Sequence, residues 1–163
     1  MSAERRARDL GLEIPDFSQG SYVGTRDTWI RPWRIHRGVL YLEGHAPVRR
    51  GEVVHPGRLG RDVTLEQGRE AARIAGLNVL AGVRAALGNL DRVECLIRSL
   101  NFVVAAEDFY DVQQVADGMT DLLADVFGPE AGYGCRATIG VQSLVRNLCF
   151  ETWVEFGLRD DTE

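Results

Sequence analysis

An arginine and a glutamate near the C-terminal end carry side chains that can do chemistry on a small molecule. Arg136 and Glu151 stand fifteen residues apart, each within a stretch of alternating residue types. A guanidinium group is planar and grips a carboxylate through two parallel hydrogen bonds. A glutamate can orient a water molecule or carry a proton. Whether the pair can act together depends on the strands that carry it.

These strands are predicted over 135–144 and 149–158, and the short turn between them predicts a hairpin. In the simplest register, Glu151 lies opposite Gln142, Trp153 opposite Gly140 and Glu155 opposite Thr138. Because strand side chains alternate between faces, one face is apolar and suited to lie under helices, with Cys135 on it. The other face carries Arg136, Thr138, Gln142, Glu151, Trp153 and Glu155.

The polar face has two interpretations. Antiparallel sheets often turn a polar face to water. A tryptophan among charges and a glycine at mid-strand instead favour a second subunit packed there. In this register Arg136 and Glu151 are separated by roughly 20 Å along the strands. We therefore predict that the two residues meet only across a subunit boundary.

The rest of the chain predicts an α+β fold. Thr64 and Gln67 form a capping box for a helix that ends at Gly88. A second helix is predicted over 108–127, and Ser2 can cap a short one over 2–10. Further strands are predicted over 39–42 and 93–104, with an extended stretch over 52–59, whereas 15–38 is irregular. Two helices of this size cover one face of one sheet.

Composition excludes several functions. All nineteen basic residues are arginine, which excludes lysine Schiff-base chemistry and a P-loop lysine. The net charge of −5 makes nucleic acid an unexpected partner. Three widely spaced cysteines, without an N-terminal apolar segment or a membrane-length apolar run, predict a cytoplasmic protein that does not enter membranes. The three histidines lack partners at metal-ligand spacing, so we expect no metal.

Several motifs follow one another in the order of a known family. They are Leu-Tyr-Leu-Glu-Gly-His-Ala-Pro (40–47), Ala-Leu-Gly-Asn-Leu-Asp-Arg-Val (86–93), Cys-Arg-Ala-Thr-Ile-Gly-Val-Gln-Ser-Leu (135–144) and Phe-Glu (150–151). In this order and spacing, the chain resembles the RidA/YjgF family of reactive-intermediate deaminases, formerly called L-PSP endoribonucleases. Its N-terminal extension is similar to a less studied branch. The resemblance divides the chain into an N-terminal helix and arm (1–38), a RidA-like domain (39–158) and a tail (159–163).

The resemblance implies a chorismate-mutase-like fold, a six-stranded and mostly antiparallel sheet backed by two helices. Three such subunits pack their sheets into a central barrel, with active sites in the clefts between subunits. The activity implied is hydrolysis of enamines and imines, here 2-imino acids, to 2-oxo acids and ammonia without a metal or organic cofactor. The partner implied is a small carboxylate metabolite.

Site residues follow position by position from the same resemblance. Arg136 matches the family's substrate arginine, and Glu151 matches the catalytic glutamate. Thr138 stands at the family's cysteine position, Gly44 lies in a substrate-binding segment, and Tyr22 aligns with a tyrosine that closes the site.

Four positions depart from the family pattern. The usual Ser-Gly-Gln is Glu43-Gly44-His45, Ala137 replaces a serine, and Val145 replaces the common proline of the last turn. Glu43 places a second negative charge near the cleft, and His45 offers a titratable group for a different ligand or a structural residue. Two alternative functions follow, a non-catalytic trimer that binds a small metabolite and, less favoured, RNA cleavage. Alternating aromatic and basic residues over 29–34 suit either RNA or a loop packed over the cleft.

Overall fold

The computed structural model describes residues 1–17 and 31–160. Its helices are α1 (Ala3–Asp9), α2 (Leu65–Leu87), α3 (Val112–Phe127) and α4 (Pro129–Gly132). Its strands are β1 (Trp33–His36), β2 (Val39–Leu42), β3 (Val48–Arg49), β4 (Glu52–Val53), β5 (Val93–Val104), β6 (Cys135–Val141) and β7 (Phe150–Leu158). Short 3-10 turns, η1 (Leu90–Arg92) and η2 (Val145–Asn147), precede β5 and β7.

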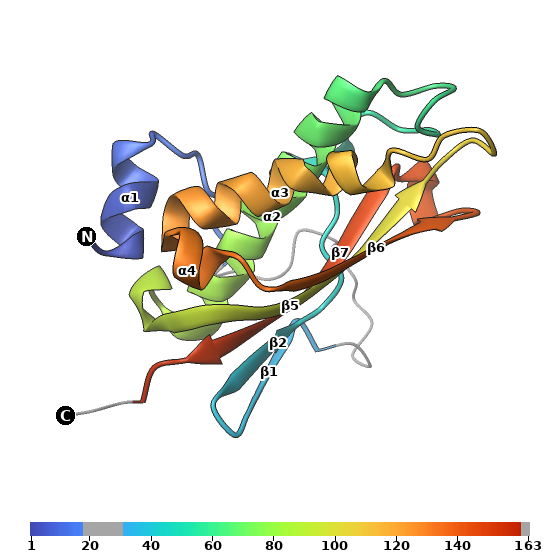
Figure 1. Ribbon diagram of the computed structural model, residues 1–163. Coiled ribbons are helices and arrows are strands. Elements are labelled where there is room, and N and C mark those ends of the chain that lie inside the picture. Colours follow the sequence, from blue (N-terminus) through green and yellow to red (C-terminus); the bar gives the residue numbers. More distant parts are fainter. Residues whose placement is uncertain (18–30, 161–163) are drawn as a thin grey trace.

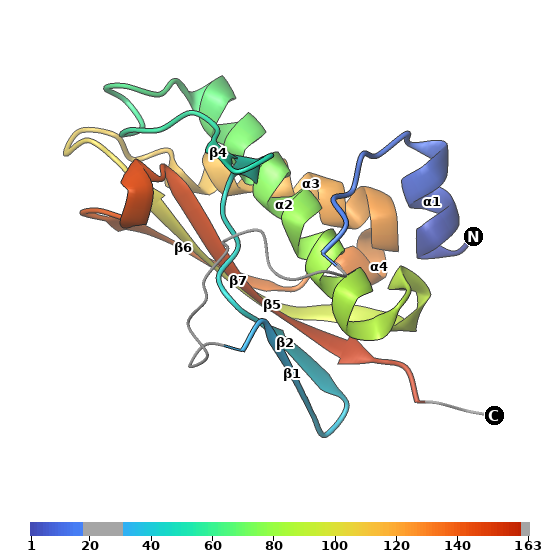
Figure 2. The ribbon, with the colours of Figure 1, turned by 180° about the vertical axis from the view of Figure 1, so that it is seen from behind.

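The main sheet has five strands in the order β1-β2-β7-β5-β6. Every neighbouring pair is antiparallel except β5 and β6, which run parallel. Strands β3 and β4 form a separate two-stranded ribbon beside α2 (Figure 2). The α+β class and the mostly antiparallel sheet are confirmed. The prediction of one six-stranded sheet is wrong, because β3 and β4 pair with each other and do not join the main sheet.

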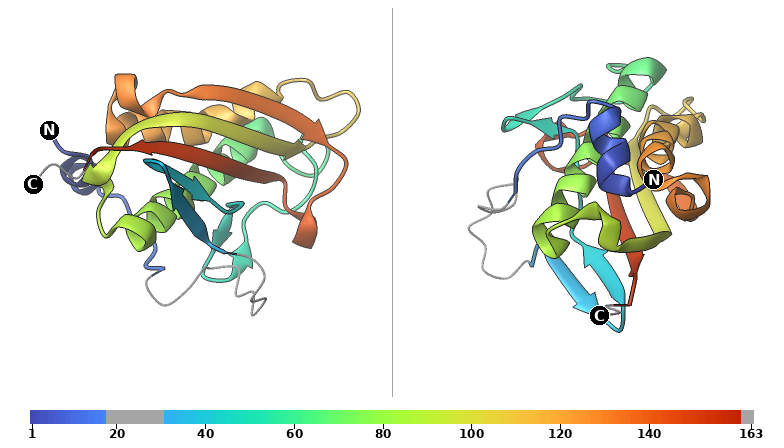
Figure 3. Two further views of the ribbon diagram at one scale, coloured as in Figure 1. Left: turned by 90° about the horizontal axis from the view of Figure 1, so that it is seen from below. Right: turned by 90° about the vertical axis from the view of Figure 1, so that its left-hand side faces the viewer.

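Helices α2 and α3 cover one face of this sheet (Figure 1). In the described part of the chain no helix covers the opposite face, here called the open face (Figure 3). The capping box at the start of α2 forms as predicted, with Thr64 and Gln67 each bonding the other's backbone. Gly88 ends α2 in the left-handed region at φ 79°. The core lies between the two helices and β7, where Phe150, Val154 and Phe156 are buried.

Helix α1 is fixed to the C-terminal end of α2 by one side chain. Glu4 accepts hydrogen bonds from Arg84 at 3.1 and 2.7 Å and from the backbone of Leu90 at 2.9 Å. The arginine holds the pKa of this carboxyl below its usual value. The predicted N-terminal helix is therefore confirmed, and it packs as part of the domain.

The predicted hairpin of the last two strands is wrong. Strand β5 lies between β6 and β7, so that Phe102 has Ile139 on one side and Glu151 on the other. Strand β6 follows helix α3, and a strand–helix–strand connection usually returns the chain parallel to the first strand. Chain neighbours β6 and β7 are consequently not neighbours in the sheet.

This pairing reverses the predicted faces of β6 but not those of β7. Arg136 stands level with the buried residues Ser99 and Val154, on the face under the helices. Cys135, predicted to be in the core, is exposed instead. On β7 the apolar residues face the helices as predicted, and Trp153 lies on the open face with 52% of its surface exposed.

Candidate functional site

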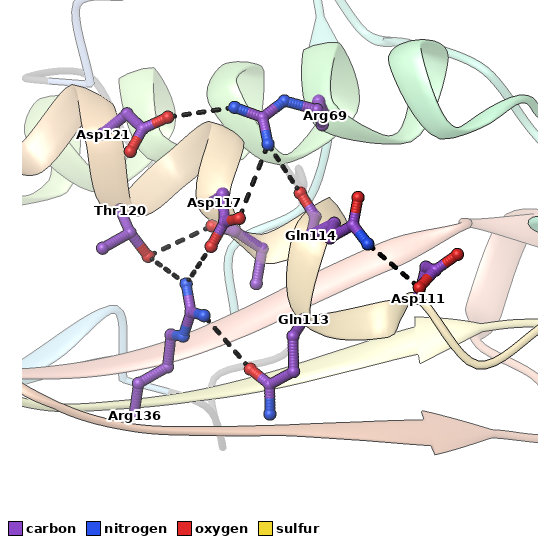
Figure 4. A network of polar contacts seen from close by, with 9 residues as sticks. Arg69, Asp111, Gln113, Gln114, Asp117, Thr120, Asp121 and Arg136 are labelled. Carbon is purple, nitrogen blue, oxygen red and sulfur yellow. Dashed lines mark hydrogen bonds and ion pairs between the residues drawn. The ribbon is translucent and has the colours of Figure 1, made fainter.

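Arg136 is held by one side of helix α3 (Figure 4). Its Nη1 donates to Asp117 Oδ1 at 2.7 Å and to Thr120 Oγ1 at 2.9 Å, and its Nη2 donates to Gln113 Oε1 at 3.1 Å. The three acceptors lie four and three residues apart, which puts them on one face of a helix. Only 23% of the arginine side chain is exposed. The guanidinium is thus fixed in orientation at the sheet's β6 edge.

The partner carboxylate is shared with a second arginine. Arg69 of α2 approaches Asp117 Oδ2 at 3.5 Å and Asp121 Oδ2 at 3.0 Å, and it donates to the backbone of Gln114 at 3.1 Å. Two arginines therefore face two aspartates, and the formal charges balance. The sequence did not identify Asp117, although the spacing of Gln113, Asp117 and Thr120 on a predicted helix was the signal.

Thr138 also faces the helices and begins a row of polar contacts across the sheet. Its Oγ1 accepts from Asn101 Nδ2 at 3.4 Å, and Asn101 Oδ1 accepts from Thr152 Oγ1 at 2.7 Å. Asn101 and Thr152 are fully buried. Such interior polar groups need partners, and this row supplies them. Arg136 and Thr138 are therefore brought to the same face, two residues apart on one strand.

Glu151 lies on the open face with Gly44. Glu151 Oε1 accepts from Trp153 Nε1 at 3.1 Å. A Cβ atom on Gly44 would lie 2.6 Å from that carboxylate oxygen, so a larger residue at this position would require the Glu151 carboxylate to move. Phe102 supports the tryptophan, with ring centroids 5.4 Å apart in an edge-to-face arrangement.

The predicted residues thus form two groups on opposite faces of the sheet. Glu151 stands level with Ile139, three residues beyond Arg136, which is roughly 10 Å along the strand. One small substrate cannot contact both side chains within one protomer. The prediction that both side chains lie on one face, roughly 20 Å apart along the strands, is wrong. The sheet itself lies between them. Tyr22, the remaining predicted residue, lies outside the described residues.

His45 is an interior residue. It is 2% exposed, and its Nδ1 lies 2.7 Å from the carbonyl oxygen of Glu43. Its backbone pairs with Thr152, which places the ring beneath α2 next to Gly82. Burial lowers the pKa of the imidazole to about 4, so the ring is neutral at pH 7. This environment agrees with the structural interpretation of His45.

Residues 1–17 and 31–160 contain no group of three histidine, cysteine, aspartate or glutamate side chains placed to hold a metal ion. Among the helices of the same ranges, none combines the length and apolar character needed to cross a bilayer.

Known proteins resemble this chain over most of its length. The profile of the family described as "YjgF/chorismate mutase-like, putative endoribonuclease" matches residues 4–151. Protein TCP17 of Trypanosoma cruzi is 36% identical over 105 residues, which are 64% of this chain and 66% of that protein. The chain therefore spans slightly less than two thirds of this curated relative.

Two solved structures share both fold and sequence similarity. Atu1372 of Agrobacterium tumefaciens, described as having unknown function, is 30% identical with a TM-score of 0.84, over 96% of this chain and 92% of that one. A protein of Shewanella oneidensis MR-1 described as a putative endoribonuclease is 27% identical with a TM-score of 0.87, over 97% and 100%. With the family profile covering most of its residues, the chain belongs to the RidA/YjgF family.

Proposed function

We propose that this protein binds small carboxylate metabolites at Arg136 and hydrolyses 2-imino acids in a site completed by a neighbouring protomer. The observation that carries the proposal is the guanidinium at the β6 edge, oriented by Asp117, Thr120 and Gln113. A guanidinium that is already oriented loses little conformational entropy when it binds a carboxylate. TdcF of Escherichia coli, a fold relative at 18% identity and a TM-score of 0.61, is described with bound serine, an amino acid with such a carboxylate.

A homotrimer is part of the proposal. The open face exposes Trp153 by 52%, Ile139 by 47% and Tyr41 by 40%. Large apolar side chains gathered on one uncovered sheet face are typical of an interaction surface. Glu151 lies on this same face, so a second copy packed there can place its own Arg136 edge near the carboxylate. Three copies closing their sheets into a barrel would supply three such sites.

The reaction requires water and proton transfer but no cofactor. The substrate carboxylate binds Arg136 while Glu151 of the neighbouring protomer orients a water molecule and accepts its proton. The water oxygen bonds to the imine carbon, and the proton passes to nitrogen. The hydroxyl group of the resulting carbinolamine then gives its proton to the amine. The carbon–oxygen bond becomes the carbonyl as the carbon–nitrogen bond breaks, and ammonia leaves. One water is consumed, and a 2-oxo acid and one ammonia are released.

The decisive experiment measures ammonia release from freshly generated 2-iminobutyrate. We expect Arg136→Ala to lower kcat/KM by about 100-fold, because the substrate carboxylate loses its charged hydrogen bonds to the guanidinium. Arg136→Lys should recover only part, since an ammonium cannot form the two-point grip. Arg61→Ala is the matched control, because Arg61 is exposed and pairs with its neighbour Asp62 at 2.9 Å. Wild-type activity in folded Arg136→Ala would contradict the proposal.

A second candidate, a non-catalytic binding protein, is favoured by one observation. The arginine is already paired with Asp117, and Glu151 lies on the opposite sheet face. Arg136-dependent binding of 2-oxobutyrate, together with ammonia release no faster than in buffer, would identify this function.

RNA cleavage remains the less favoured alternative. The family description carries an endoribonuclease label, whereas the chain has a net charge of −5. Absence of RNA binding at low salt would exclude this activity. We further propose a cytoplasmic location, which the free thiols of Cys95, Cys135 and Cys149 support.

A further inference from the structure

We infer that Asp117 is a specificity-determining residue that weakens the grip of Arg136 on anionic ligands and so limits which carboxylates the site accepts. The inference rests on the proposed function of Arg136. It goes beyond that function because it assigns to the carboxylate of helix α3 an effect opposite to that of the arginine it contacts.

The first step concerns the atoms involved. Asp117 Oδ1 lies 2.7 Å from Nη1, the shortest of the three contacts to the guanidinium. An incoming carboxylate needs two adjacent N–H groups of the same fork. It must therefore either displace Asp117 or bind beside it, and each route costs free energy that an uncharged neighbour would not impose.

The second step is that Asp117 is held in place. Arg69 lies 3.5 Å from its other oxygen, and Arg69 is itself fixed by Asp121 at 3.0 Å. The carboxylate is therefore gripped from helix α2 as well as from strand β6 (Figure 4). An anchored anion cannot swing away when a ligand arrives.

The third step is that the guanidinium does not need this charge for its orientation. Thr120 and Gln113 are uncharged acceptors that contact Nη1 and Nη2 at 2.9 and 3.1 Å. An asparagine at position 117 keeps an oxygen acceptor of the same size. Asp117→Asn therefore removes a negative charge and leaves the cradle for Arg136 intact.

The experiment compares Asp117→Asn with Asp121→Asn in the full chain. Both variants remove one negative charge from the same helix, but Asp121 pairs with Arg69 rather than Arg136. Dissociation constants for 2-oxobutyrate and for its uncharged analogue 2-oxobutyramide are measured by calorimetry. We expect Asp117→Asn to bind 2-oxobutyrate about tenfold more tightly, the effect of one nearby charge in a partly exposed site. We expect Asp121→Asn to change the constant less than threefold and the amide to bind equally to all proteins.

The double variant Asp117→Asn/Arg136→Ala tests where the gain arises. If the tighter binding of 2-oxobutyrate depends on the guanidinium, this double variant should bind 2-oxobutyrate no more tightly than Arg136→Ala alone. A gain below threefold in Asp117→Asn, an equal gain in Asp121→Asn or an equal gain for the amide would overturn the inference while Arg136-dependent binding persists. If neither wild type nor Asp117→Asn binds 2-oxobutyrate through Arg136, the proposed function itself fails. The two failures are therefore distinct.

Discussion

A buried histidine couples the stability of this protein to pH. The pKa of His45 is about 4 in the folded chain, against an ordinary value of 6.5. Above pH 6.5 the ring is neutral in both folded and unfolded chains. As pH falls from 6.5 to 4, the unfolded chain gains a proton that the folded chain does not. We expect the free energy of unfolding to fall by about 3 kcal/mol across this window.

Denaturant unfolding at pH 7, 5.5 and 4.5 measures this loss, with His45→Gln as the comparison. The glutamine carries no titrating group, so its stability should depend less steeply on pH over the same range. Carboxylates such as Glu4 also lose stabilising partners in acid, but they do so in both proteins. Equal pH slopes for the two proteins would show that the histidine is not the cause.

The family resemblance identified the arginine but not its neighbour. Arg136 was found from its place in the family's motif, whereas its contact with Asp117 depends on how helix α3 and strand β6 pack together. Helix α3 must cross β6 on the correct side, and β6 must pair with β5 so that Arg136 turns toward that helix. Tertiary structure thus places a residue that local alternation assigned to the opposite face.

At the scale of elements, one glycine allows the two long helices to approach each other. A Cβ atom on Gly118 of α3 would lie 2.0 Å from the backbone oxygen of Arg69 in α2. We expect Gly118→Ala to lower the free energy of unfolding by about 3 kcal/mol, because backbone cannot yield as a side chain can. The helix preference for alanine cannot offset this clash.

Gly140→Ala on β6 is the matched control, since its Cβ would meet nothing within 4 Å. It should stabilise the protein by about 0.5–1 kcal/mol through the entropy of the unfolded chain. Urea unfolding compares the two variants directly. Similar stabilities would mean that the helices can separate without cost.

Elements with strong local signals were predicted well. The capping box at Thr64 and the left-handed Gly88 fix both ends of α2 without help from other segments. The strand β5 was also predicted at its observed limits. Strand β1 was not assigned, because three of its four residues are exposed and it forms only by pairing with β2. The turn at Arg37 and Gly38, both at positive φ, was the available signal.

For the whole molecule, the open sheet face should determine assembly. We expect Trp153→Arg to give a monomer, because a charge replaces the largest exposed apolar side chain of that face. Light scattering coupled to gel filtration measures the mass. Because the proposed site needs two protomers, the monomer should also release no ammonia from 2-iminobutyrate.

Tyr110→Arg is the control for this change. Tyr110 is 83% exposed but lies in the segment before α3, outside the strands that form the open face. It should leave mass and activity unchanged. Full activity in a verified Trp153→Arg monomer would refute the shared site.

The position of β7 constrains how the chain can fold during its synthesis. This last strand of the sequence lies in the middle of the sheet, between β2 and β5. Until residues 150–158 leave the ribosome, no strand can link the β1-β2 pair to the β5-β6 pair. The nascent chain can form its helices early, whereas the sheet closes in a single late step. Stop codons before residue 150 should therefore yield unfolded fragments and not a smaller domain.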